Sequence, residues 1–88
     1  MDTASKKKLK SQAHSLKPVI IVGQAGCTDA VLAETEIALN THELIKIKIR
    51  AERDERNLIR DKMCATTGAT LIQSIGQIAV IYRLNPKK

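Results

Sequence analysis

The feature that most constrains the fold is a strict alternation of isoleucine with basic residues in the segment LIKIKIR at positions 44–50. Successive side chains of a β-strand point to opposite faces of its sheet, so one face of this segment is aliphatic and the other is basic. The two sets are Ile45, Ile47 and Ile49 on one face, and Lys46, Lys48 and Arg50 with Leu44 on the other. The segment therefore predicts a half-buried strand with a basic outer face.

The rest of the chain divides into further segments of alternating type. Residues 18–22, PVIIV, are continuously apolar, which is typical of a strand buried on both faces. Apolar residues at helical spacing predict one thin N-terminal helix and two longer helices. The predicted helices span residues 4–15, 29–41 and 53–67, and two last strands span residues 70–75 and 78–83. The pair Gly76-Gln77 between those strands suits a two-residue type II′ hairpin turn.

Several residues are expected to set the ends and the inner faces of the helices. Ser5 is the predicted N-cap of the first helix and Thr28 that of the second, because a hydroxyl can accept a hydrogen bond from a free backbone N–H. Gly68 is predicted to end the third helix in the left-handed conformation. The third helix is expected to turn Leu58, Ile59 and Met63 inward.

The predicted fold is a single α/β (α+β) domain covering residues 1–88, with the order α-β-α-β-α-β-β. Two right-handed crossovers would place both long helices on one face of the sheet. The final hairpin adds an antiparallel strand, so the four-stranded sheet is mixed, and its second face can be covered only by the N-terminal helix. We expect residues 1–3 and 85–88 to be frayed.

Charge is segregated along the chain. The total is +6, from 15 Lys and Arg against 9 Asp and Glu. Residues 1–17 carry five lysines and one aspartate, a net +4, whereas residues 18–43 carry four acids and no Lys or Arg, a net −4. Residues 44–50 then carry +3. This distribution predicts a basic face of the kind that binds nucleic acid. The single aromatic residue, Tyr82, argues against modules that stack bases on aromatic side chains.

Other classes of protein find little support. Cys27 and Cys64 lack CxxC spacing and nearby histidines, so no metal site and no cofactor are predicted. The N-terminus lacks the apolar stretch of a signal peptide, and no apolar run approaches the roughly 20 residues that span a bilayer, so we expect a cytoplasmic location without membrane contact. His14 and His42 have no partner at catalytic spacing, so we expect no enzymatic activity.

Two glycines, Gly23 and Gly26, stand where the apolar strand of residues 18–22 leads into a helix. Their spacing matches neither a P-loop nor the GxGxxG dinucleotide fingerprint. A GxxG loop can let a nucleic-acid backbone approach helix N-terminal amides, as in KH domains. A tight turn in which glycine supplies a positive φ explains the same tetrapeptide, so both interpretations stay open at this point.

The candidate RNA-contacting residues are the loop and the basic side chains that can share its face. They are Gly23, Gln24, Ala25, Gly26, Lys46, Lys48, Arg50, Lys6, Lys7, Lys8, Lys10, Lys17, Arg53 and Arg60. A solvated N-terminal tail explains the first lysine cluster equally well. Intrahelical pairing with neighbouring acids explains Arg53 and Arg60.

Two longer blocks resemble a known family. AHSLKPVIIVGQAGCT at residues 13–28 and HELIKIKI at residues 42–49 closely resemble the CRM domain, in particular its stand-alone bacterial YhbY form. The resemblance covers the chain from about residue 8 to residue 83. Cys27 stands where that family usually has leucine, and Gln24-Ala25 is an uncharged version of a loop that often carries a basic residue.

The resemblance implies a fold similar to the C-terminal domain of bacterial initiation factor three and an RNA-binding activity without catalytic residues. It implies a binding surface made of residues 23–26 and nearby basic side chains. Bacterial members of the family resemble factors associated with large-subunit ribosome precursors, and plant relatives act in intron splicing. We therefore expect a protein that binds rRNA in precursors of the large (50S) subunit and assists ribosome assembly, by recognising RNA shape and backbone.

Two other functions stay open at the level of the sequence. The basic face could dock on an acidic protein as an adaptor, or it could bind structured RNA or DNA unconnected with the ribosome. We expect a monomer, because no apolar stripe is left over once the core is built.

Overall fold

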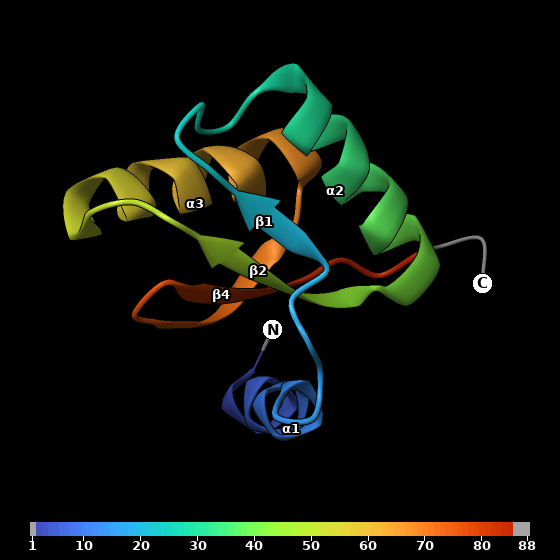
Figure 1. Ribbon diagram of the computed structural model, residues 1–88. Helices are drawn as coiled ribbons and strands as arrows, with labels where there is room; N and C mark the ends of the chain where they lie inside the picture. Colours follow the sequence, from blue (N-terminus) through green and yellow to red (C-terminus); the bar gives the residue numbers. More distant parts are fainter. Residues whose placement is uncertain (1, 86–88) are drawn as a thin grey trace.

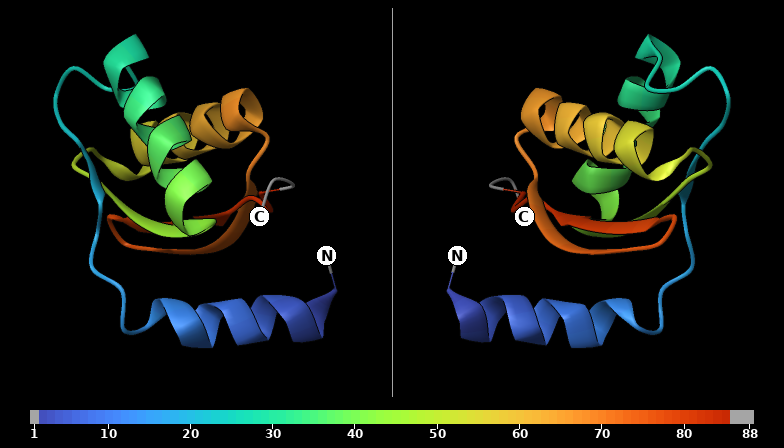
Figure 2. Two further views of the ribbon diagram at one scale, coloured as in Figure 1. Left: turned by 90° about the vertical axis from the view of Figure 1, so that its right-hand side faces the viewer. Right: turned by 90° about the vertical axis from the view of Figure 1, so that its left-hand side faces the viewer.

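A four-stranded sheet lies between two layers of helices (Figures 1 and 2). The computed structural model describes residues 2–85 of the chain. In chain order the elements are α1 (Thr3–Ala13), β1 (Ile20–Val22), α2 (Asp29–His42), β2 (Leu44–Ile49), α3 (Arg53–Thr67), β3 (Thr70–Ile75) and β4 (Ile78–Tyr82). Helices α2 and α3 cover one face of the sheet, and α1 lies against the other. The predicted class and element order are confirmed.

The sheet is mixed, with the strand order β1-β2-β4-β3. Strand β2 pairs with β1 in parallel and with β4 in antiparallel orientation, and β3 pairs with β4 as a hairpin. Gly76 has a φ of +55° and Gln77 has no positive φ, which is the pattern of the predicted type II′ turn. The hairpin folds back so that β4, not β3, lies beside β2, and the basic strand thereby becomes an interior strand.

The main core lies between the sheet and the pair α2 and α3. The three isoleucines of β2 are each at most 2% exposed, as the alternation predicts. They pack with aliphatic residues from the neighbouring strands and both helices, namely Ile20, Val22, Leu39, Ile59, Met63, Ala79 and Ile81. Burying one such side chain stabilises the fold by about 1.5–3 kcal/mol, so this cluster is the main source of stability.

A smaller core lies between α1 and the other face of the sheet. Ala13, Ile72 and Val80 are buried there, and Leu9, Leu44, Ile78 and Tyr82 pack around them. The helix ends at Ala13, so it covers only part of this face. The uncovered part carries side chains that point away from the main core, including the lysines of β2.

Two predictions about buried side chains are wrong. The apolar segment before the glycines was expected to be buried on both faces, but β1 is an edge strand and Ile21 is 57% exposed because α1 does not reach it. Leu58 was expected to turn inward and is 71% exposed. Ile59 and Met63, four residues apart, face the core, and Leu58 is rotated about 100° away from Ile59 on the helix.

The ends of the helices agree with the sequence in two of three cases. Thr28 accepts a hydrogen bond from the Val31 N–H, and Gly68 ends α3 with a φ of +75°, as predicted. The N-cap of α1 is Asp2 rather than Ser5, because the Asp2 carboxylate accepts a 2.7 Å hydrogen bond from the Ser5 N–H. That hydrogen bond lowers the pKa of the Asp2 carboxyl group.

The ends of the described chain are held to the fold. Asp2 and Thr3 belong to the start of α1, and Asn85 donates from its backbone to the Glu43 carboxylate at 2.7 Å. Residue 1 and residues 86–88 lie outside the described residues. Between residues 2 and 85, none of the helices combines the length and the apolar character needed to cross a bilayer.

Candidate nucleic-acid interface

The glycine loop starts beside the end of the basic strand. The Arg50 N–H donates to the Val22 carbonyl at 2.9 Å, so the loop leaves β1 next to the last basic residue of the LIKIKIR segment. The loop closes on itself through a 3.0 Å hydrogen bond from the Gly26 N–H to the Gly23 carbonyl. Gly26 has a φ of +73°, a conformation that only glycine adopts readily, and it directs the chain toward the N-terminus of α2.

The loop presents unused hydrogen-bond donors. Within residues 2–85, the backbone N–H groups of Gln24, Ala25 and Cys27 donate to no acceptor. They precede the N-terminus of α2, where the helix dipole favours negative charge. Amides in this position can donate hydrogen bonds to an anion such as a phosphate group.

Gly23 differs from Gly26, because nothing in the fold requires glycine there. Its φ is not positive, and a Cβ built on it would meet no atom within 4 Å. The tight-turn explanation therefore accounts for Gly26 only. A missing side chain at position 23 leaves the backbone open to close approach from outside.

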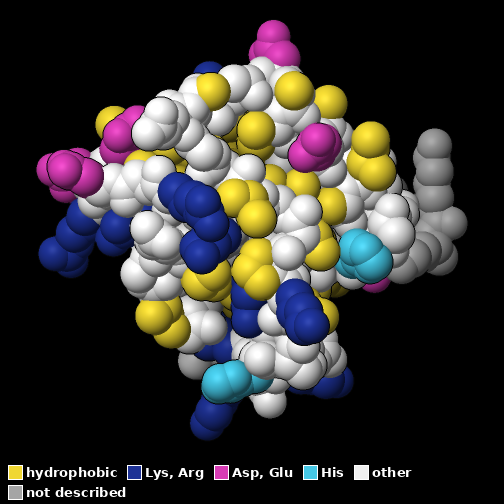
Figure 3. Space-filling model, viewed as in Figure 1, with side chains coloured by type: hydrophobic (Ala, Val, Ile, Leu, Met, Phe, Trp, Pro, Cys, Tyr) yellow, Lys and Arg dark blue, Asp and Glu magenta, His cyan; other side chains and the backbone are white. Residues whose placement is uncertain are grey.

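The basic side chains of β2 continue the surface that begins at the loop. Lys48 lies in register between Ile21 of β1 and Ile78 of β4, and Lys46 lies two residues further along the same face. Within the described part of the chain, the side chains of Lys46, Lys48 and Arg50 make no hydrogen bond and no ion pair. Basic groups lie over the sheet and α1, whereas acidic groups lie over α2 and, mixed with basic ones, at the α3 side of the view (Figure 3). The loop and the strand therefore form one basic surface.

Comparison with known proteins identifies the family of this chain. The model of the CRS1/YhbY (CRM) domain family matches residues 1–83. The chain belongs to the CRM domain family.

Relatives within the CRM family carry names that refer to RNA. A protein of Pseudomonas aeruginosa named as a probable RNA-binding protein is 55% identical over 83 residues, which cover 93% of this chain and 80% of that protein. A Haemophilus influenzae protein named as an RNA-binding protein is 46% identical over 84 residues, covering 94% of this chain and 85% of that protein. The solution structure of a hypothetical Staphylococcus aureus protein, described as a candidate RNA-binding protein, has a TM-score of 0.83 at 27% identity and covers 96% of this chain and 88% of its own.

The α1 lysines do not all face the same way in this CRM domain. Lys6 and Lys10 share one flank of α1 with His14, because residues four apart lie on the same side of a helix. Lys8 lies on the other flank, where it lines a hollow with His42 and Glu43 of the α2–β2 junction. Lys7 is exposed on α1, and Lys17 is exposed in the connection to β1.

The two arginines of α3 that were predicted to join the site differ sharply. Arg53 is exposed at the start of the helix, which follows directly from the end of β2. The Arg60 guanidinium is used within the protein: it donates to the carboxylate of Asp61 at 2.9 Å and to the side chains of Asn57 and Ser74. The geometry therefore leaves Arg53 available to a ligand and holds Arg60 inside a network.

Lys62 is a cation near the loop that the residue pattern did not predict as part of the site. This lysine, with Glu55 and Leu58, lines an open groove between α3 and the glycine loop at Ala25 and Gly26. The position of Lys62 three residues after the buried Ile59 places it near the core side of the helix, but the sequence does not show that α3 passes beside the loop. Lys62 is therefore a further cation next to the free amides.

Neither cysteine supplies reactive chemistry to the surface. Burial raises the pKa of the Cys27 thiol and of the Cys64 thiol, so both stay protonated at neutral pH. Among residues 2–85, no three side chains of the His, Cys, Asp and Glu types are grouped so that they could hold a metal ion. What the surface does present is backbone hydrogen-bond donors in the loop and positive charge along β2.

Proposed function

We propose that this CRM domain binds structured RNA by its sugar-phosphate backbone, through the glycine loop and the adjoining basic strand. The observation that carries the proposal is Gly23, whose missing side chain serves neither the backbone conformation nor the packing. The function that remains for it is close approach of a ligand. The names of the relatives indicate that this ligand is RNA.

Two kinds of contact would hold the RNA: hydrogen bonds that position one phosphate, and charges that attract the others. The free amides of residues 24, 25 and 27 would donate to one phosphate at the positive end of α2. Lys46, Lys48 and Arg50 would neutralise the phosphates that follow along β2. Contacts of this kind fix the orientation of the protein on the RNA without reading its sequence, so specificity would come from the folded shape of the target.

We propose rRNA in precursors of the large ribosomal subunit as the target, with the protein acting as a cytoplasmic, monomeric, non-catalytic assembly factor. The support is the resemblance of residues 13–28 and 42–49 to the stand-alone YhbY form of the family. A mixed basic and acidic surface suits this setting, because the basic face can hold RNA while the α2 side stays free (Figure 3).

A binding assay tests the role of the loop. Gly23→Asp places a carboxylate against the proposed phosphate position and should weaken binding to a fluorescent rRNA hairpin at least about tenfold, which is 1.4 kcal/mol. Ala33→Asp adds the same charge on the exposed side of α2 and should change the affinity less than about twofold. A folded Gly23→Asp protein that binds as tightly as the wild type would remove the loop from the site.

Sedimentation of the tagged protein from a low-salt lysate tests the target. Co-migration with large-subunit precursors that is lost after RNase treatment or at high salt is the expected result. Co-migration with a protein complex that survives RNase would instead show an adaptor. Free protein at the top of the gradient in both samples would contradict the ribosomal target while leaving RNA binding itself to the hairpin assay.

A further inference from the structure

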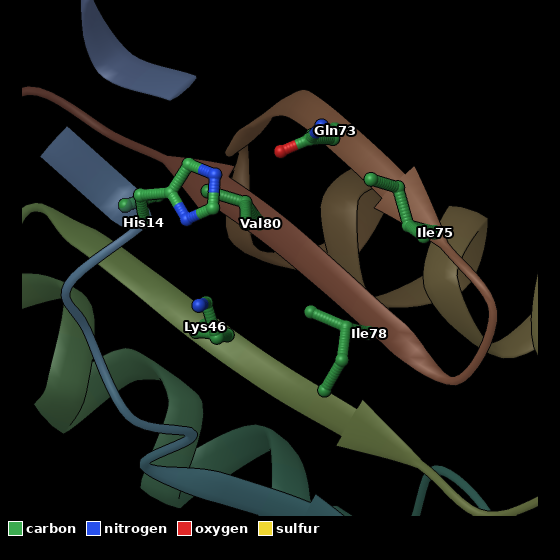
Figure 4. Close-up of a pocket in the computed structure, with 7 residues that line it drawn as sticks. His14, Lys46, Gln73, Ile75, Ile78 and Val80 are labelled. Carbon is green, nitrogen blue, oxygen red and sulfur yellow. The ribbon is translucent and has the colours of Figure 1, made fainter. Parts of the chain in front are cut away.

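A pocket of about 210 Å³ lies where α1 ends over the open part of the sheet. Its lining comes from four elements, with Ala13 and His14 at the end of α1, Lys46 on β2, Gln73 and Ile75 on β3, and Ile78 and Val80 on β4 (Figure 4). It forms because α1 stops at Ala13 and the chain turns away toward β1, which leaves the sheet beyond it uncovered.

Three polar side chains surround this pocket. His14, Lys46 and Gln73 come from three different elements and lie around the same hollow (Figure 4). Across residues 2–85, none of these three side chains makes a hydrogen bond or an ion pair. A few convergent polar groups beside an apolar wall are the usual composition of a ligand pocket.

The remaining wall is aliphatic. Ile78 and Val80 lie two residues apart on β4, and Ile75 is opposite Ile78 in the hairpin. Ile75 is 63% exposed, so most of its apolar side chain faces water. A flat, apolar ligand placed there would cover it and gain the free energy of removing that surface from water.

The polar and apolar groups that line the pocket could together bind the base and the phosphate of one nucleotide. An amide that donates and accepts can pair with the edge of a base, an imidazole can hydrogen-bond to it or lie against its face, and an ammonium group attracts the phosphate. The volume is below the roughly 300–1,000 Å³ of pockets for drug-sized ligands, which suits one ring system rather than a stack. We propose that this pocket holds a single unpaired nucleotide of the bound RNA, with its base against Ile75 and Ile78.

The pocket lies on the path of the RNA that we have proposed, and the inference rests on that function. Lys46 lines the pocket, Lys48 follows two residues later beside Ile78, and Arg50 stands next to the glycine loop. An RNA backbone that follows β2 from the loop would therefore bring a nucleotide to the pocket. The domain would prefer RNA helices with an unpaired base at the corresponding distance from the phosphate held by the loop.

The test compares a plain RNA hairpin with a bulged hairpin that has one additional unpaired nucleotide. In a second version of the bulged hairpin, fluorescent 2-aminopurine replaces the unpaired base. In a series of bulged hairpins the unpaired nucleotide is moved along the RNA helix, so that its distance from the phosphate held by the glycine loop is varied. The wild-type protein should bind the best bulged hairpin about five to ten times more tightly than the plain hairpin, because covering apolar side chains with one base adds to the backbone contacts. The emission of 2-aminopurine should change on binding.

Two variants and a matched control assign the effect. Gln73→Ala removes the amide, and Ile75→Thr keeps a β-branched residue at an exposed position of β3, so both should fold. Each should reduce the affinity for the bulged hairpin to that for the plain hairpin, with the plain hairpin unaffected. Gln77→Ala, in the turn outside the pocket lining, should leave the preference intact.

The outcomes separate the pocket from the general function. Binding of all hairpins with equal affinity would overturn the pocket and leave the proposed RNA binding in place. A preference that comes without a 2-aminopurine signal, or that both variants retain, would also overturn it, because the bulge would then act through the shape of the helix. Failure to bind any hairpin would overturn both proposals.

Discussion

At the scale of single residues, the two glycines of the loop differ in backbone conformation. Gly26 adopts a φ of +73° in a turn closed by its own N–H, so the fold depends on it. Gly23 has an ordinary φ and open space around its Cα. The GxxG motif does not distinguish the two positions. The backbone geometry does, because it requires glycine at position 26 and leaves position 23 for the ligand approach that we propose.

This difference predicts opposite effects on stability. Gly26→Ala should lower the free energy of unfolding by about 1–2 kcal/mol, because an L-residue is strained in the left-handed region. Gly23→Ala should leave it unchanged or raise it by up to about 1 kcal/mol, since alanine restricts the unfolded chain. Urea unfolding monitored by circular dichroism measures both.

The control for these variants is RNA affinity measured on the same samples. Gly23→Ala should weaken binding although the protein is at least as stable as the wild type. Equal losses of stability in the two alanine variants would show that position 23 also serves the fold.

At the scale of elements, the segment after β4 ties the two long helices together. The Arg83 guanidinium donates to the Glu36 carboxylate at 2.7 Å and to Asn40, both on α2, and to the Thr67 carbonyl at the end of α3 at 2.8 Å. Its backbone N–H donates to the Glu43 carbonyl, just after α2. One arginine thus connects the C-terminal ends of both helices to the end of β4.

Arg83→Ala should destabilise the domain by about 1–2 kcal/mol. Three hydrogen bonds of a charged group are lost, and the side chain is 21% exposed, so water recovers part of that energy. The melting temperature should fall by about 4–16 °C for a domain of this size. Arg50→Ala, which removes an exposed arginine without an internal partner among residues 2–85, should leave it within about 2 °C.

The elements themselves were largely predictable, and the exceptions have a physical cause. The period of two in residues 44–50 and the helical spacing of Ile59 and Met63 located β2 and α3 within a residue. Periodicity could not show that β1 is an edge strand, because a continuous apolar run looks the same whether or not a helix covers it. Ile21 is exposed because α1 stops early, and that depends on tertiary packing.

The sequence predicted most residues of the candidate site but not how they are arranged in space. The glycine loop and the cations of β2 follow from residue types and spacing, and the structure places them side by side through the Arg50 to Val22 hydrogen bond. Lys62 was missed because its approach to the loop depends on how α3 packs. The commitment of Arg60 to Asn57 and Ser74 likewise joins elements that are distant in sequence.

At the scale of the whole molecule, the charge segregation along the chain becomes a segregation between faces. The acids of α2 lie on one side of the sheet, where α3 carries both signs of charge, and the cations of β2 and α1 lie toward the other (Figure 3). A net charge of +6 therefore understates the positive potential of the basic surface. Such a surface attracts RNA over distances of about the Debye length, roughly 8–10 Å at moderate salt.

The salt dependence of RNA affinity should report this surface. If about four phosphates are neutralised, log affinity should fall with log salt concentration with a slope between about −3 and −4. Lys48→Gln should make the slope shallower by about one, because one fewer counterion is released. Glu34→Gln on the exposed side of α2 is the control, and it should leave the slope unchanged. A salt-independent affinity would contradict backbone recognition.

The strict alternation in β2 places residues needed for the core and residues proposed for RNA contact at alternate positions of one six-residue strand. Positions 45, 47 and 49 are buried in the core, and positions 46 and 48 carry the side chains that we propose for RNA contact. Mutations at the outer positions can therefore retune affinity during evolution with little risk to the core, whereas a one-residue insertion would exchange the two sets. In descendants of this chain, the length of β2 should be far more constant than the identity of its outward side chains.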